Sequence, residues 1–286
     1  MDSFADQVFD RTAKYIEQVF NRLGESVSKA SDLNRLEEVR KHLRPGKMLR
    51  TQLGIALCEH AEANIDSLAR ASAATEMIHT ATLFHDDVID GGMIRRNQDT
   101  LWREVGTTGA ILLGDLFFST AIDLLLEADD LFLAKSFVGK VRELCLAEVE
   151  HELLFRSNKA EIQDALHLAR GKTGTLFAFI AESCADRTNA QEIKNYAEVG
   201  YLVGTAYQLL DDILDEVGTE ESMGKTLHTD KEREKFTLVQ QGWSKEAVEE
   251  QMQNLEEQAC ALIAKSPDKV TRLRAYIGQF SVSKLT

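Results

Sequence analysis

Residues 81–90 read ATLFHDDVID, an apolar run that ends in a cluster of aspartates. The same DDxxD pattern recurs in residues 206–215, which read AYQLLDDILD. In both places apolar side chains precede the aspartates and separate them. Carboxylates in such surroundings are not typical of a solvated surface, so both clusters indicate a functional interior of the fold.

Each aspartate cluster is expected to act as one group. Positions four apart on a helix lie on one face, about a turn apart. Asp86 with Asp90, and Asp211 with Asp215, therefore point their carboxylates in one direction. Clustered carboxylates repel one another unless cations neutralise them. Two clusters facing each other across a cavity would hold divalent cations, which in proteins mostly bind phosphate.

Proline usage and apolar spacing indicate the fold class. The chain of 286 residues has 2 prolines, Pro45 and Pro267, and apolar residues recur at three- and four-residue spacing nearly throughout. This combination is typical of long helices. We expect an all-α protein, a bundle of about a dozen helices around a central cavity, forming one domain over residues 1–286. A helix break is expected at Gly106.

Composition argues against several partners. A net charge of −14 cannot build the broad basic surface that nucleic acid requires. No integral membrane segment is expected, because no stretch reaches the roughly 18 charge-free apolar residues that span a bilayer. The most apolar region, residues 111–126, is interrupted by Asp115 and Asp123. The acidic N-terminus lacks the regions of a signal peptide, which favours a cytoplasmic location.

Basic side chains lie in sequence beside the first cluster. Lys47 and Arg50 stand three apart at the start of an expected helix, where the helix dipole also favours an anion. Arg95 and Arg96 follow the cluster, and on a helix such neighbours diverge by about 100° and contact different anions. Any one of these residues alone is more often a solvated surface cation, but their grouping favours anion binding.

The ordered motifs resemble the trans-isoprenyl diphosphate synthases, the polyprenyl synthetase family, over about residues 10–240. The matching segments are Gly46-Lys47-Met48-Leu49-Arg50, Asp86 to Asp90 with Arg95-Arg96, Lys172-Thr173, Gln208 to Asp215, Gly224-Lys225 and Lys235. A single DDxxD would be a weak signal, whereas this ordered set is specific. Within the family, the chain looks most like bacterial long-chain, octaprenyl-type members.

The resemblance implies a prenyltransferase. Such an enzyme condenses an allylic diphosphate with isopentenyl diphosphate, head to tail, and releases diphosphate. The resemblance also implies an isoprenoid synthase-type helical bundle and a homodimer. It further implies Mg²⁺, about three ions with substrate bound, which stabilises the charge that develops on the leaving diphosphate.

The resemblance assigns the site residues by position. The metal ligands would be Asp86, Asp90 and Asp211, with supporting or water-mediated roles for Asp87, Asp212 and Asp215. The allylic diphosphate would be bound by Arg95, Lys172, Lys225 and Lys235, and isopentenyl diphosphate without metal by Lys47, Arg50, His79 and Arg96. Thr173 and Gln208 would turn oxygen dipoles toward the cation. Taken alone, His79 would more often be a core histidine.

The product length is expected to depend on the residues about one turn before Asp86. In short-chain members of the family an aromatic residue there acts as a floor for the growing chain. This chain has Ala81 and Thr82 instead. An open tunnel at that depth predicts a product longer than about C20, on the order of C30–C50.

Other functions were weighed against this one. A short-chain farnesyl or geranylgeranyl diphosphate synthase would have the same motifs. A class I terpene cyclase would not need the second, non-ionising diphosphate site that Lys47 and Arg50 provide. A non-catalytic subunit of a heteromeric synthase typically lacks one or both clusters, and this chain has both. Departures from the family pattern include Asn97 in place of a frequent glycine and a shortened region after Lys235.

Overall fold

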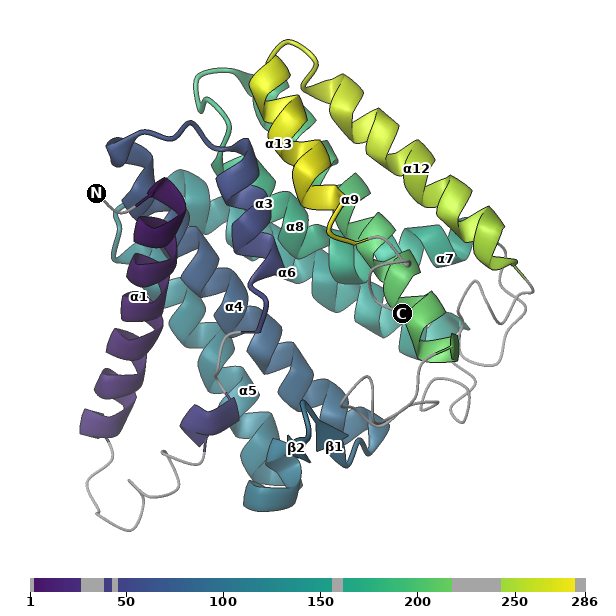
Figure 1. Ribbon diagram of the computed structural model, residues 1–286. Coiled ribbons are helices and arrows are strands. Elements are labelled where there is room, and N and C mark those ends of the chain that lie inside the picture. Colours follow the sequence, from purple (N-terminus) through teal and green to yellow (C-terminus); the bar gives the residue numbers. More distant parts are fainter. Residues whose placement is uncertain (1–2, 27–38, 43–45, 156–161, 218–242, 281–286) are drawn as a thin grey trace. The chain divides into compact units, whose positions relative to one another are not determined.

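The structure, a computed structural model, describes residues 3–26, 39–42, 46–155, 162–217 and 243–280 (Figure 1). The described part contains ten α-helices, two π-helical segments and one short β-hairpin. The predicted all-α class is therefore confirmed.

Contacts group the chain into two compact units. The first unit holds the described residues before Gln52 together with His60–Ala134. The second unit holds Gln52–Glu59 and the described residues after Ala134. The first aspartate cluster thus belongs to the first unit and the second cluster to the second unit. The single domain expected over residues 1–286 stays a prediction.

In the first unit, one long helix packs against two others. These helices are α4 (Glu62–Asp90), α1 (Phe4–Ser26) and α5 (Leu101–Leu126). Phe84 of α4 meets Phe117 of α5 edge to face, with ring centroids 5.9 Å apart. Phe20 of α1 lies 6.3 Å from the same Phe117 ring. Burial of such rings contributes roughly 1.5–3 kcal/mol each, and it fixes the orientation of α4 two residues before Asp86.

Helix α5 changes direction at a glycine. Gly106 has a φ of 79° and a ψ of 163°, so the helical hydrogen bonds are interrupted there, and the predicted break is confirmed. Among the helices of the described part, α5 alone is long and apolar enough to cross a membrane, and 33% of its most apolar window is buried. This is a weak indication, because interior helices of soluble proteins have the same composition.

The chain leaves α4 through a turn and not through a further helix. Gly91 ends α4 in the left-handed conformation, with a φ of 62°. Strands β1 (Ile94–Arg95) and β2 (Gln98–Asp99) then pair antiparallel. The two residues between them, Arg96 and Asn97, have φ values of 52° and 59°, as a two-residue hairpin turn requires. Arg95 and Arg96 therefore lie on a hairpin, and the divergence expected of neighbours on a helix does not apply to them.

The second unit is built around α9 (Ala190–Val217). It packs against α8 (Thr175–Ser183) and α12 (Lys245–Leu262). The remaining elements are α6 (Leu131–Glu150), which begins in the first unit, η1 (His151–Phe155), α7 (Ile162–Ala169), η2 (Arg170–Gly174) and α13 (Pro267–Ile277). Helix α3 (Leu49–Leu57) crosses from the first unit into the second.

Two glycines of α9 allow a close helix contact. A Cβ atom at Gly200 would lie 2.4 Å from the Cα of Ala178, and one at Gly204 would lie 2.6 Å from the Cα of Gly174. Any larger residue would separate α9 from η2 and α8. The contact brings Gln208 of α9 to the π-helical segment that carries Thr173.

Candidate active site

The three aspartates of the first cluster have different surroundings. Asp86 and Asp90 are partly exposed at the end of α4, whereas Asp87 is 5% exposed. Asp87 accepts hydrogen bonds from Arg95, at 2.8 Å from Nη2 to Oδ1 and at 3.0 and 3.1 Å from Nε to the two oxygens. Asp87 therefore anchors Arg95 on the hairpin, and Asp86 and Asp90 present the carboxylate pair.

The carboxylates of this cluster and the Arg95 guanidinium stabilise each other's charged forms. Burial raises the pKa of the Asp87 carboxyl, and the Arg95 guanidinium offsets part of that rise. Burial alone would lower the pKa of Arg95, but Asp87, Asp86 and Asp90 raise it. The Arg95 guanidinium therefore stays charged beside the aspartates, where it could bind a diphosphate.

The donor atoms of Asp86 and Asp90 fit a hard cation. Carboxylate oxygens are the ligands that Mg²⁺ prefers. Within the described ranges, no group of three His, Cys, Asp or Glu side chains is arranged to hold a metal ion. Mg²⁺ usually keeps several waters and shares phosphate oxygens, so a carboxylate pair suits it.

A second group of cations assembles in the first unit. The guanidinium of Arg96 lies against Gly46, where a Cβ atom would be 2.7 Å from Nη2. The charges of Arg50 and Arg96 both lower the pKa of the buried Glu76 carboxyl. The same two arginines and Arg95 also lower the pKa of the His79 ring. The structure therefore brings together three motifs that are far apart in the sequence.

His79 is held neutral in this group. Burial lowers the pKa of its ring well below the usual range, and Arg50, Arg96 and Arg95 lower it further. A neutral imidazole offers one donor to an anion without adding another charge.

Next to Lys47, which is exposed, Met48 has a φ of 48°. A residue without special freedom in this region is strained, and such strain is enriched at functional sites.

The second unit positions the predicted polar residues in a chain of hydrogen bonds. Thr173 Oγ1 donates to Gln208 Oε1. Gln208 Nε2 in turn donates to Asp212 Oδ1 at 2.9 Å. Lys172 Nζ lies 2.9 Å from Glu148 Oε2 and 3.0 Å from His151 Nδ1. Thr173 and Gln208 thus form one polar group beside the second cluster, and Lys172 is held from α6 and η1.

The second cluster is described in part. Asp211 and Asp212 lie partly exposed on α9. The side chain of Asp215 and the residues Lys225 and Lys235 lie outside the described residues. That the two clusters face one another stays a prediction.

The residues predicted to set product length lie on α4. Ala81 is fully buried, and the Thr82 hydroxyl donates to the His79 carbonyl at 2.8 Å. Ile78 and Met77, which precede them on the helix, are also buried, with exposures of 0% and 1%. No aromatic residue stands at positions 81 and 82, and the role of Ala81 in product length stays a prediction.

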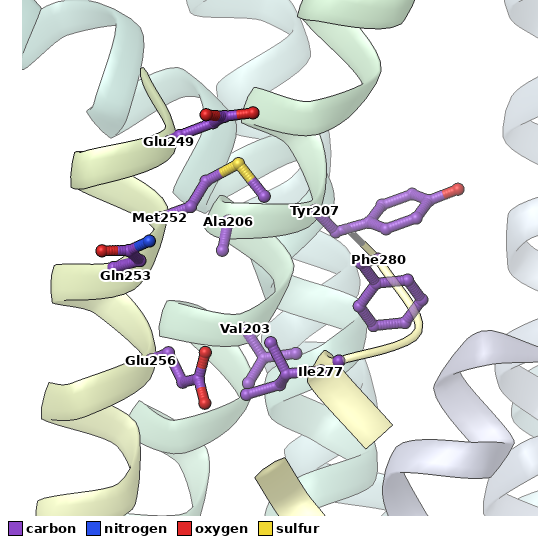
Figure 2. A pocket seen from close by; sticks show the side chains of 10 residues that line it. Val203, Ala206, Tyr207, Glu249, Met252, Gln253, Glu256, Ile277 and Phe280 are labelled. Atoms are coloured by element: carbon purple, nitrogen blue, oxygen red, sulfur yellow. The ribbon is translucent and has the colours of Figure 1, made fainter. Parts of the chain in front are cut away.

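A separate pocket of about 370 Å³ lies in the second unit, between α9, α12 and the end of α13 (Figure 2). Its apolar lining comes from Val203, Ala206, Tyr207, Met252, Ile277 and Phe280. Among the described residues that line it, Glu249 and Glu256 carry charge, and both are negative. Their carboxylates would repel a diphosphate.

Three residues near the predicted site were missed from the sequence. Glu76 belongs to the segment that leads into the first cluster, and its position three residues before His79 placed it on the same helix face. Glu148 and His151 contact Lys172 from another helix, and no local spacing indicates that contact.

Comparisons with known proteins agree with these features. The family model of polyprenyl synthetases matches residues 34–277. A short chain isoprenyl diphosphate synthase of Methanothermobacter thermautotrophicus is 30% identical over 82% of this chain and 74% of its own length. An all-trans-nonaprenyl-diphosphate synthase of Rhodobacter capsulatus is 33% identical over 62% of this chain and 55% of its own length.

A solved structure gives the same fold. A geranyltransferase from Helicobacter pylori, complexed with magnesium and isoprenyl diphosphate, superposes with a TM-score of 0.75 at 20% identity. The superposition covers 98% of both chains. The isoprenoid synthase-type fold predicted from the motifs is therefore confirmed.

Proposed function

Because the chain belongs to the polyprenyl synthetase family, whose matched relatives are trans-prenyltransferases, we propose that it condenses an allylic diphosphate with isopentenyl diphosphate. The two substrates join head to tail, and diphosphate is released. The single observation that carries this proposal is the group of Arg50, His79 and Arg96 in the first unit. This group supports a diphosphate site built from side chains alone, close in sequence to a cluster suited to metal.

The two diphosphates require different sites. The allylic substrate must lose its diphosphate, so negative charge grows on its bridging oxygen as the carbon becomes cation-like. When bound at Asp86, Asp90 and Asp211, about three Mg²⁺ ions would stabilise that charge. Arg95, kept in place by Asp87, would supply a fixed cation to this diphosphate, and the family resemblance assigns the same substrate to Lys172, Lys225 and Lys235.

Isopentenyl diphosphate must be held without being ionised. Lys47, Arg50, Arg96 and neutral His79 bind its diphosphate and leave its double bond free to attack the allylic carbon. The hydroxyl of Thr173 and the amide of Gln208 orient oxygen dipoles toward the carbon that becomes positive. The departing diphosphate is the base that accepts the proton in the last step.

A long product is the finer part of the proposal. Relatives of this chain include farnesyl, geranylgeranyl and nonaprenyl synthases, so their names do not decide its length. The small side chain of Ala81 supports growth beyond about C20, on the order of C30–C50. The alternative is a short-chain synthase that stops at an obstacle elsewhere.

A homodimer is also proposed. In the first unit, α5 exposes Ile111, Leu112 and Leu116, with Leu112 61% exposed. In the second unit, α6 exposes Leu146 and Val149. Apolar faces of this kind on neighbouring stretches of chain support burial against a second copy.

The test is turnover by the purified protein alone. With Mg²⁺, farnesyl diphosphate and isopentenyl diphosphate, we expect diphosphate release and prenyl products longer than the starter. Asp86→Ala should abolish turnover while the protein stays folded. Diphosphate release from farnesyl diphosphate without isopentenyl diphosphate, giving a cyclic hydrocarbon, would instead indicate a cyclase. No turnover without a second protein would indicate a subunit of a heteromeric enzyme.

A further inference from the structure

A buried acid lies among the cations assigned to isopentenyl diphosphate. Glu76 of α4 is 7% exposed, and its Oε1 atom has no hydrogen-bond partner among the described residues. Ser72 precedes it by one turn on the same helix face, and its buried Oγ atom also has none. Unpaired buried polar atoms are rare in folded proteins and call for a specific explanation. The reaction steps above make no use of either residue.

Positive charge reaches Glu76 from two parts of the first unit. The charges of Arg50 in α3 and of Arg96 in the hairpin turn are close enough to lower the pKa of its carboxyl. His79 follows it by three positions on α4 and is subject to the same arginines and to Arg95 of β1. Burial raises the pKa of the Glu76 carboxyl, and Arg50 and Arg96 offset part of that rise. The carboxylate is therefore the local counter-charge of the two arginines.

We propose that Glu76 is a positioning residue of the metal-free diphosphate site and that it takes up a proton when isopentenyl diphosphate binds. This inference rests on the proposed function. Before binding, the carboxylate balances Arg50 and Arg96 and holds their guanidinium groups together. A bound diphosphate supplies that balance itself. One O–H bond then forms on Glu76 with a proton from solvent, and no bond of the substrate changes.

Glu76 is a better proton acceptor than its neighbour His79. Only the two arginines oppose the effect of burial on Glu76, so their neutralisation by diphosphate leaves burial to favour the protonated acid. Burial and three arginines all act against protonation of His79. Binding of the diphosphate is therefore expected to protonate Glu76 before it protonates His79.

Calorimetry can count the proton. Isopentenyl diphosphate is titrated into the protein with EDTA and without allylic diphosphate, so that it binds without reaction. Repeating the titration in buffers of different ionisation enthalpy gives the number of protons taken up. We expect roughly half to one proton per site near neutral pH, and a dissociation constant that weakens by up to about tenfold per unit as the pH rises.

Two variants separate the acid from its neighbour. Glu76→Gln keeps the shape of the side chain and should lose both the proton uptake and the pH dependence of binding. His79→Asn should keep the proton uptake. Uptake that persists in Glu76→Gln, or disappears in His79→Asn, would overturn the assignment.

A third measurement needs no variant. Infrared difference spectra of the wild-type protein should gain a carboxylic-acid band when isopentenyl diphosphate binds. Binding without this band and without proton uptake would refute the role of Glu76 and leave the proposed function standing. A wild-type protein that does not bind isopentenyl diphosphate at all would overturn both.

Discussion

Removing Arg95 should lower the free energy of unfolding more than removing its partner Asp87. The Asp87 side chain is 6% exposed and that of Arg95 is 33% exposed. Arg95→Ala leaves a buried carboxylate without its guanidinium, and losing one partner of a buried pair typically costs about 3–5 kcal/mol. Because Arg95 is partly exposed, we expect the lower end, about 3 kcal/mol. Asp87→Ala leaves a guanidinium that water can reach, for which we expect about 1–2 kcal/mol.

The double variant makes the reasoning testable. With neither charge present, Arg95→Ala with Asp87→Ala should be about as stable as Asp87→Ala alone, which corresponds to a coupling of roughly 3 kcal/mol. Urea unfolding at pH 7 measures all three free energies. Arg103→Ala is the matched control, because its partner Asp99 is 53% exposed and such pairs contribute only about 0–1 kcal/mol. Additive losses, or a smaller loss for Arg95→Ala than for Asp87→Ala, would refute the argument.

The sign of the pH dependence follows from the Asp87 carboxyl. Its folded pKa is raised above the unfolded value of 3.8, so the folded state binds the proton more tightly. The corresponding stability is present below the unfolded pKa and is lost as the pH rises through the folded pKa. The deficit of Arg95→Ala relative to the double variant should therefore shrink as the pH is lowered from 7.

Three further predictions concern other residues. The folded pKa of His79 is depressed, so its contribution to stability is full above about pH 6.5 and falls by up to about 1.4 kcal/mol per unit below it; urea unfolding should show this slope in the wild type and a smaller one in His79→Asn. Ala81→Phe should shorten the product in chromatography, and an unchanged product distribution would exclude a tunnel at this depth. Leu112→Glu should place a charge in the proposed dimer face and shift the protein toward monomer in sedimentation, whereas Asp123→Glu on the same helix should not.

Sequence patterns predicted the elements of the fold better than their ends. Long proline-free helices and the break at Gly106 followed from local chemistry, because a helix interior tolerates neither proline nor a glycine in an extended conformation. The arginine pair lies on a hairpin, where the side-chain directions expected of helical neighbours do not apply. Gly91 ends the helix, and the left-handed residues Arg96 and Asn97 then form the turn. Asparagine adopts this conformation readily, so its replacement of a glycine is compatible with the turn.

The site was predictable where residues share one helix and less so where partners come from elsewhere. Asp86 and Asp90 follow from helical spacing. One of two adjacent aspartates can pair with a basic side chain of the protein, and the path of the following segment decides which one. Here the hairpin after α4 brings Arg95 back to Asp87. Lys172 likewise acquires Glu148 and His151 through packing of distant elements. Periodicity contains no information on such contacts.

The adjacent aspartates of the first cluster thus divide two tasks that the pattern DDxxD leaves undistinguished. On a helix, neighbouring side chains diverge by about 100°, so Asp86 and Asp87 cannot serve one ligand equally. Burial of Asp87 makes it dependent on Arg95, and that dependence keeps a guanidinium beside the exposed pair Asp86 and Asp90. A substitution at Asp87 should therefore act through Arg95, both weakening binding of the allylic diphosphate and lowering kcat. A substitution at Asp86 should act on kcat, because metal-bound charge stabilises the departing diphosphate more than the bound substrate.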